Sequence, residues 1–173
     1  MMDFQGKGFA FCGYSGSGKT TLISALIARL ATRLRIAYLK HDAHAFEMDY
    51  PAKDTHRVFE SGARTVVINS PSKWAAIGRG IEDFREQLKH LASHELVFVE
   101  GYKESFLPKA VLLDRENRIV LDGTVERLKN VTCLIGLRPD QRSLLPNLPF
   151  FLRDQVESIE HLVLKTLGIG GVL

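Results

Sequence analysis

Short apolar runs alternate along the chain with segments in which apolar residues recur every three or four positions. The runs predict buried β-strands, and the wider spacing predicts amphipathic helices that cover them. The expected strands are residues 8–13, 35–39, 65–68, 96–99 and 131–135. The expected helices are residues 20–34, 51–62, 81–91 and 154–167. Strands that are apolar throughout and separated by helices predict an α/β fold with a mostly parallel sheet covered on both faces.

Residues 108–122 break this alternation. Two short apolar segments, 110–113 and 119–121, flank the polar sequence DRENR, which is typical of a β-hairpin. We expect this hairpin as an insertion in a single domain that spans residues 1–173. A hairpin at a sheet edge offers unpaired backbone groups to a second copy of the chain. Residues 73–77 are expected to form a further edge strand.

The composition is that of an ordinary globular protein, because 45% of the residues are hydrophobic and 25% are charged. The two cysteines, Cys12 and Cys133, exclude a four-cysteine metal site, so a reducing cytoplasm is the expected compartment. A net charge of +3, evenly spread, argues against a nucleic-acid surface. We expect the protein to be neither exported nor membrane-spanning, because residues 1–13 do not read as a signal peptide and no apolar run approaches the length of a spanning helix. Any ligand must therefore be inferred from individual motifs.

The strongest motif is GYSGSGKT at residues 13–20, between a predicted strand and a predicted helix. It matches G-x-x-x-x-G-K-[ST], a loop whose backbone N–H groups surround phosphate oxygens at the positive end of a helix. Lys19 is expected to neutralise the β and γ oxygens, and the Thr20 hydroxyl is expected to hold Mg²⁺. The motif predicts a purine nucleoside triphosphate site. It does not choose between ATP and GTP, or between hydrolysis, transfer and simple binding.

A second element of such a site is an acid at the end of another buried strand. Glu100 follows the apolar residues 96–99, and Gly101 beside it permits close approach to a phosphate or to metal-bound water. From this position a carboxylate reaches Mg²⁺ directly or through water. The alternative is an ordinary solvated glutamate at a strand end.

The sequence KHDAH follows the second predicted strand, so it lies at the same edge of the sheet. His41, Asp42 and His44, together with His56, are candidate ligands of a transition metal. The same loop is equally suited to receive a substrate or a partner, or to lie in solvent. Asp54 stands early in the next predicted helix, where the helix dipole favours a carboxylate. Its functional alternative is to sense the γ-phosphate or Mg²⁺.

Several sequence blocks occur in an order that resembles a known family. They are GYSGSGKTTL at 13–22, YLKHDAH at 38–44, KDTHRVFESGA at 53–63 and LVFVEGYK at 96–103, followed by PKAVLL at 108–113. The combination resembles the molybdopterin-guanine dinucleotide biosynthesis adaptor proteins, MobB, over nearly the whole chain. The resemblance implies a P-loop three-layer α/β/α sandwich and Mg²⁺-dependent GTP binding with slow hydrolysis. It also implies a homodimer that assists the enzyme attaching GMP to molybdopterin.

The resemblance further implies roles for individual residues. Thr20 and Glu100 serve Mg²⁺, and Lys19, Glu100 and Asp54 act on the triphosphate. His41, Asp42 and Asp54 line the site beside the phosphates. The other wall is shaped by Gly101, Tyr102 and Lys103. The residues that bind the triphosphate are Gly13, Tyr14, Ser15, Gly16, Ser17, Gly18, Lys19, Thr20 and Thr21.

The base-reading sequence Asn-Lys-x-Asp of many GTPases does not occur in the chain. Residues 135–139 follow the last buried strand, where a base-reading loop is expected. GTP as the ligand therefore rests on the family resemblance and not on a motif.

Two other functions remain open at this stage. A small-molecule kinase would use Glu100 or Asp42 at an acceptor hydroxyl. A metal-insertion GTPase would receive nickel or zinc at His41, His44 and His56. Candidate stabilisers of transition-state charge are Arg57, Arg64 and Arg79.

Overall fold

A computed structural model describes residues 6–41, 49–51, 53–80 and 82–170. By their contacts the residues divide into two compact units. The sheet unit comprises Met1–His41 and Leu88–Leu173, and the hairpin unit comprises Asp42–Gln87.

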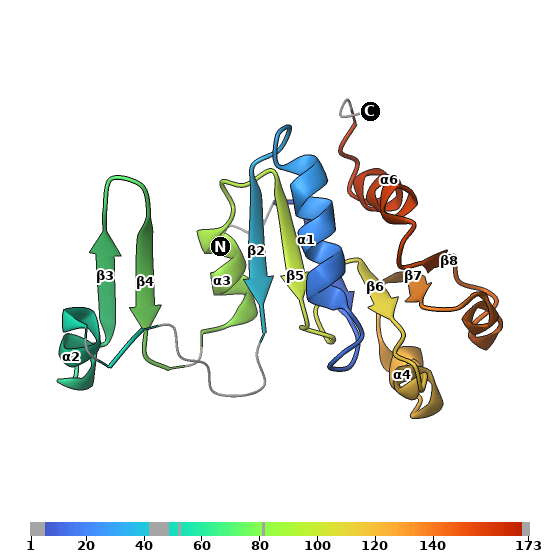
Figure 1. Ribbon diagram of the computed structural model, residues 1–173, viewed down its shortest axis with the longest axis horizontal. Coiled ribbons are helices and arrows are strands. Elements are labelled where there is room, and N and C mark those ends of the chain that lie inside the picture. The colour runs from blue at the N-terminus through green and yellow to red at the C-terminus, as the bar shows by residue number, and fades with distance from the viewer. Residues whose placement is uncertain (1–5, 42–48, 52, 81, 171–173) are drawn as a thin grey trace. The chain divides into compact units, whose positions relative to one another are not determined.

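The sheet unit contains a six-stranded sheet in the order β2-β5-β1-β6-β7-β8 (Figure 1). All of its neighbouring strands are parallel. Its strands are β1 (Gly8–Cys12), β2 (Ile36–Lys40), β5 (Leu96–Glu100), β6 (Lys109–Leu112), β7 (Val131–Gly136) and β8 (Phe150–Leu152). Every residue of β1, β5 and β6 is buried, which explains why these strands are apolar apart from Glu100 at the end of β5 and Lys109 at the start of β6. The expected α/β fold with a mostly parallel sheet is confirmed.

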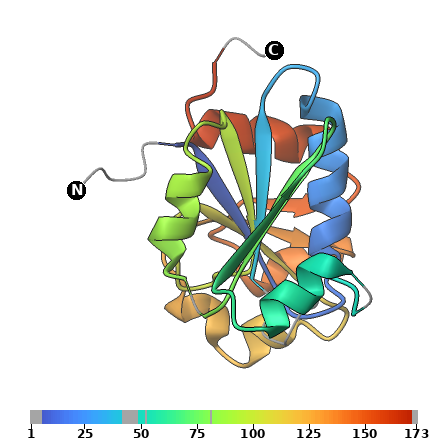
Figure 2. The same ribbon diagram turned by 90° about the vertical axis from the view of Figure 1, so that its left-hand side faces the viewer.

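Helices cover both faces of this sheet. On one face, α1 (Lys19–Leu30) and α6 (Val156–Thr166) pack over Phe9, Phe11 and Leu112; Figure 2 shows α1 running alongside the strands. On the other face, α4 (Arg118–Leu121) and α5 (Thr124–Arg127) contribute Ile119 and Val125 to a second apolar cluster. Strand β6 serves both clusters, because successive side chains of a strand point to opposite faces. A 3₁₀ helix, Pro139–Leu144, follows β7.

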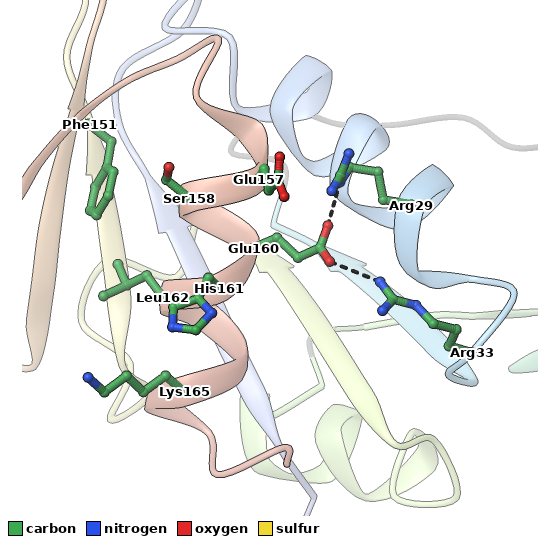
Figure 3. A pocket seen from close by; sticks show the side chains of 9 residues that line it. All are labelled: Arg29, Arg33, Phe151, Glu157, Ser158, Glu160, His161, Leu162 and Lys165. Carbon is green, nitrogen blue, oxygen red and sulfur yellow. Dashed lines mark hydrogen bonds and ion pairs between the residues drawn. The ribbon is translucent and has the colours of Figure 1, made fainter. Parts of the chain in front are cut away.

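Helices α1 and α6 are joined by an ionic cluster. The buried carboxylate of Glu160 on α6 accepts hydrogen bonds from Arg29 at 2.5 Å and from Arg33 at 2.9 Å, and Arg29 lies in the last turn of α1 (Figure 3). These residues line a cavity of about 630 Å³ together with Phe151, Glu157, Ser158, His161, Leu162 and Lys165. The cavity lies at the end of α1 remote from Lys19, so it is separate from the predicted phosphate site.

The expected hairpin at 108–122 is wrong. Strand β6 lies inside the sheet and pairs with β1 on one side and β7 on the other, so it has no free edge for a hairpin partner or a second copy. Residues 118–121 form helix α4, not a strand. The physical reason lies in the turn: Asn117 adopts a left-handed conformation, and the Asp114 carboxylate accepts the Arg118 N–H at 2.9 Å. The helix then buries Ile119 against the sheet.

The hairpin unit contains α2 (Asp54–Glu60), β3 (Thr65–Asn69) and β4 (Trp74–Gly78), and most of α3 (Phe84–His90). Strands β3 and β4 pair antiparallel and form a separate two-stranded sheet. The expectation that residues 65–68 join the main sheet is therefore wrong, whereas residues 73–77 do fall largely within a strand. Arg79 directly follows β4 and contacts the end of α2 within this unit. Its guanidinium lies 4.1 Å from the Phe59 ring centre and 3.2 Å from the Glu60 carboxylate.

Within the described residues, no helix has the length and apolar character needed to cross a membrane.

Candidate nucleotide-binding site

Residues 13–20, the phosphate loop, connect β1 to α1 at the carboxyl edge of the sheet. In parallel sheets this edge is where ligands bind. Gly13, Gly16 and Gly18 have φ of 154°, 78° and 84°, a region that side chains with a Cβ rarely adopt. Gly18 is the N-cap of α1, so the positive end of the helix opens onto the loop. The backbone thus has the conformation that the motif requires for wrapping an anion.

Lys19 lies over the beginning of this loop. Its Nζ donates hydrogen bonds to the carbonyl oxygens of Gly13 and Tyr14, both at 3.0 Å. Burial lowers the pKa of Lys19, and the negative charge of Glu100 opposes this effect. A half-buried ammonium held by two neutral carbonyls is well placed to exchange them for phosphate oxygens.

Thr20 and Glu100 are 80 residues apart in the chain and meet at the loop. The Thr20 Oγ1 lies 2.8 Å from one carboxylate oxygen of Glu100 and 3.1 Å from the other. Glu100 is only 5% exposed, so the alternative of a solvated strand-end glutamate is wrong. Strand β5 lies next to β1 in the sheet and delivers this carboxylate to the first turn of α1.

Tyr38 on β2 is a site residue that our sequence reasoning did not single out. Its hydroxyl donates a hydrogen bond of 2.7 Å to the Glu100 carboxylate. Burial, followed by this hydrogen bond, raises the pKa of Tyr38, so the hydroxyl keeps its proton. The sequence carries no direct signal for this contact, because it follows from the parallel pairing of β2 with β5, which places the carboxyl ends of both strands side by side.

The wall next to Glu100 is formed by the ends of β2 and β5. The backbone N–H of His41 donates to the Glu100 carbonyl at 2.9 Å. Gly101 has φ of 89°, and a Cβ added to it would lie 3.2 Å from the Cβ of His41. The rings of His41 and Tyr102 lie 4.9 Å apart. The structure therefore brings His41, Gly101 and Tyr102 together at the predicted edge.

Tyr14 connects the phosphate loop to the segment after β6. Its hydroxyl donates a short hydrogen bond to the carboxylate of Asp122. This bond is the main reason why the pKa of Asp122 falls to about 2. On the other side, the Lys103 ammonium lies 4.3 Å from the centre of the Tyr14 ring. Lys103 is thus placed at the loop, as expected.

The loop after β7 is held by a buried glutamine. The side-chain oxygen of Gln141 accepts the backbone N–H groups of Leu137 and Arg138 at 2.6 and 3.0 Å. Its amide nitrogen donates to the Asp114 carbonyl at 3.0 Å. The Gln141 side chain therefore ties the candidate base-reading residues 135–139 to the segment after β6.

The structure does not test four of the predicted site residues against the phosphate loop. Asp42 and His44 lie outside the described residues. Asp54 and His56 belong to α2 in the hairpin unit, and the Asp54 carboxylate lies 3.5 Å from Arg57. Among the described residues, no three histidine, cysteine or acidic side chains gather as a metal site. The roles of Asp42 and Asp54 stay predictions.

Arg153 is a second residue that sequence reasoning missed. It directly follows β8, and its guanidinium lies against Gly18 of the phosphate loop. The signal for it was a cation immediately after an apolar strand, in the sequence FFLRD, at the same carboxyl edge.

Comparison with known proteins decides the family. Residues 9–132 match the family model of MobB, described as molybdopterin guanine dinucleotide synthesis protein B. The chain belongs to the MobB family. The match covers most of the chain, so the family resemblance drawn from the sequence blocks is confirmed.

Curated relatives agree with this MobB assignment. The chain is 33% identical over 128 residues to the molybdopterin-guanine dinucleotide biosynthesis adapter protein of Escherichia coli (strain K12), covering 67% of this chain and 73% of that protein. It is 37% identical over 109 residues to the protein of the same name from Haemophilus influenzae, covering 60% and 61% respectively. The crystal structure of Bacillus subtilis MobB superposes with a TM-score of 0.74 at 23% identity, covering 93% of this chain and 98% of that one, which supports the fold.

Proposed function

We propose that this MobB-family chain binds a guanine nucleotide at the phosphate loop and acts as an adapter in the synthesis of molybdopterin guanine dinucleotide. The observation that carries the nucleotide site is the contact of Thr20 with Glu100 at 2.8 Å, beside a loop of the required conformation. The adapter role is supported by family membership and by the names of the curated relatives.

The donor set fits Mg²⁺, which prefers hard oxygen ligands. The Thr20 hydroxyl and the Glu100 carboxylate would hold the ion, which would supply positive charge to offset that of the phosphate oxygens. Tyr38 orients the carboxylate by its hydrogen bond of 2.7 Å. Lys19 would exchange its two carbonyl partners for phosphate oxygens.

We propose that hydrolysis of the bound GTP is slow. The Glu100 carboxylate is buried and accepts hydrogen bonds from two hydroxyls, so it is placed to hold the metal. It is therefore a poor candidate for a base that activates water. We retain Asp54 as the candidate that senses the γ-phosphate. For Asp54→Asn we expect slower GTP hydrolysis with unchanged GDP affinity. If the variant hydrolyses GTP at the same rate as the wild type, Asp54 does not act in the site.

The nucleotide proposal is tested by titrating labelled GTP and labelled ATP in Mg²⁺. Lys19→Ala is expected to weaken GTP binding at least about tenfold, because it removes charge-assisted hydrogen bonds to phosphate. Glu100→Gln keeps the shape of the side chain and is expected to abolish the dependence of GTP affinity on Mg²⁺. Equal affinity for ATP and GTP would overturn the guanine assignment and favour a kinase-like function.

The adapter proposal needs a second assay. We expect wild-type protein to increase the rate at which the GMP-transferring enzyme forms molybdopterin guanine dinucleotide, and Lys19→Ala to lose this effect. If Lys19→Ala stimulates as well as wild type, the adapter role does not depend on the nucleotide. If neither protein stimulates, the adapter role itself is contradicted.

We also propose that the chain forms a homodimer, with a second copy covering the β3–β4 sheet. An isolated two-stranded sheet is marginally stable in water, and this one exposes Val67, Ile68 and Trp74 by 65%, 54% and 73%. Sedimentation of the double variant Val67→Ser, Trp74→Ser is expected to show monomers where wild type shows dimers. A monomeric wild type at high concentration would exclude the dimer.

A further inference from the structure

Arg153 is positioned by the end of the sheet and covers the phosphate loop. Its backbone N–H donates to the Gly136 carbonyl at 3.0 Å, which anchors it at the carboxyl ends of β7 and β8. A Cβ added to Gly18 would lie 2.4 Å from Arg153 Nη1, 2.7 Å from Cζ and 3.1 Å from Nε. The guanidinium therefore lies directly against the residue at which α1 begins.

The hydrogen-bonding capacity of this guanidinium is largely unused. Its Nε is buried and has no acceptor, and its Nη2 reaches the Leu113 carbonyl only at 3.5 Å. Arg153 forms no ion pair with any residue that the structure describes, whereas Arg118 pairs with Asp114 and Arg29 pairs with Glu160. An orphaned donor of this kind is costly in a folded protein unless a ligand satisfies it.

The electrostatic surroundings of the Arg153 guanidinium are unfavourable for a positive charge. The guanidinium lies at the positive end of α1, where a cation is disfavoured and an anion is favoured. Burial lowers the pKa of Arg153, which again shows that its charge is not compensated within the chain. A bound anion at the phosphate loop would remove both penalties.

The strand order indicates which part of a nucleotide meets Arg153. Glu100 comes from β5 on one side of β1, whereas Arg153 follows β8 on the opposite side. The metal and the γ-phosphate belong to the Glu100 side. The nucleoside would then lie on the side of β7 and β8. Residues 135–139, the candidate base-reading residues, lie on this side, at the end of β7 and in the loop that follows it. The phosphate nearest the nucleoside is the one that faces Arg153.

We propose that Arg153 is a nucleotide-binding residue whose guanidinium donates to the α-phosphate of the bound nucleotide. This inference rests on the proposed function, because it requires a nucleotide at the phosphate loop. It assigns to the last strand of the sheet a direct part in holding the ligand.

The experiment compares GTP, GDP and inorganic tripolyphosphate. Arg153→Met keeps the apolar stem and removes the charge, Arg153→Lys keeps the charge, and Lys19→Ala reports on the loop itself. Arg35→Ala is the matched control, because Arg35 is exposed at the amino end of β2, at the opposite edge of the sheet. The affinities for GTP and GDP are measured by titration with the labelled nucleotides, and the affinity for tripolyphosphate is measured by competition with labelled GTP. The Tm of each variant is measured by thermal unfolding without nucleotide.

For Arg153→Met we expect GTP and GDP to bind more weakly by the same factor, about tenfold or more, and tripolyphosphate by a similar factor. Arg153→Lys should lose less nucleotide affinity than Arg153→Met, and Arg35→Ala should keep the affinity of the wild type. The Tm of nucleotide-free Arg153→Met should stay unchanged or rise, because an uncompensated cation is removed. A residue with a merely structural role would instead lower Tm.

Three results would overturn the assignment. Unchanged affinity excludes a contact with the nucleotide, a loss for GTP alone places the contact at the γ-phosphate, and unchanged tripolyphosphate competition places it at the nucleoside. If wild type does not bind, or if Lys19→Ala binds like wild type, the proposed nucleotide site itself has failed. If Lys19→Ala loses binding and Arg153→Met does not, only the role of Arg153 has failed.

Discussion

Alanine substitutions at the three glycines of the phosphate loop should have graded effects on stability. All three residues have positive φ, but their surroundings differ. Around Gly16 no atom lies within 4 Å of an added Cβ. At Gly18 the added atom meets the end of the flexible Arg153 side chain, and at Gly13 it lies 2.6 Å from the backbone oxygen of Leu112 in β6. The three sites therefore separate the cost of backbone conformation from the cost of steric overlap.

The magnitudes follow from these contacts. Gly16→Ala carries only the conformational cost of a left-handed residue, about 1–2 kcal/mol. Gly18→Ala is expected to cost about 2 kcal/mol, because the guanidinium of Arg153 can swing away. Gly13→Ala adds an overlap with a strand that is paired on both sides and cannot move, so we expect a loss of about 3–5 kcal/mol. For a chain of this size, each kcal/mol lowers Tm by about 2–4 °C.

The assay is chemical and thermal unfolding of the nucleotide-free variants, followed by circular dichroism. The expected order of destabilisation is Gly13→Ala, then Gly18→Ala, then Gly16→Ala. GTP titration of the folded variants gives an independent check, because Gly18→Ala displaces Arg153 and should bind more weakly than Gly16→Ala. If Gly16→Ala costs as much free energy of unfolding as Gly13→Ala, the reasoning from local contacts is refuted.

Two further predictions concern other buried groups. Burial raises the pKa of Cys12 to about 11 and of Cys133 to about 12, so at pH 8 thiol labelling of the native protein should be slower than labelling of the unfolded chain by about a hundredfold or more. Rapid labelling without denaturant would contradict this burial. Glu160→Gln weakens the bonds to Arg29 and Arg33 and should lower Tm by about 2–5 °C, measured by thermal unfolding, with a smaller difference in high salt. An unchanged Tm would show that the ionic cluster does not stabilise the packing of α1 on α6.

Local patterns predicted the elements that carry the phosphate site. The apolar run before Gly13 and the spacing of Leu22, Leu26 and Leu30 determine a strand, a loop and a helix within about 25 residues, and the structure has them there. Element boundaries were less accurate. The last helix begins at Val156 with Gln155 as its N-cap, not at the expected residue 154. The Gln155 side chain accepts the Leu152 N–H at 2.8 Å, so Gln155 belongs to the turn that precedes the helix.

The errors in the fold have a common physical cause. Residues 65–68 and 119–121 are short apolar segments, and such segments do not by themselves state which neighbour they will pair with. The first pairs with β4 in a separate sheet. The second coils into α4, because β6 already has strands on both sides.

The sequence by itself determined the chemistry of this MobB-family protein: a glycine-rich loop with Lys19 and Thr20 before a helix, and an acid at the end of a buried strand. Only the tertiary structure decided that Tyr38 meets Glu100 and that Arg153 covers Gly18. Turns and helices depend on residues a few positions apart, so the sequence displays them directly. Contacts between distant residues depend on the order of the strands, and uniformly apolar strands do not encode that order locally.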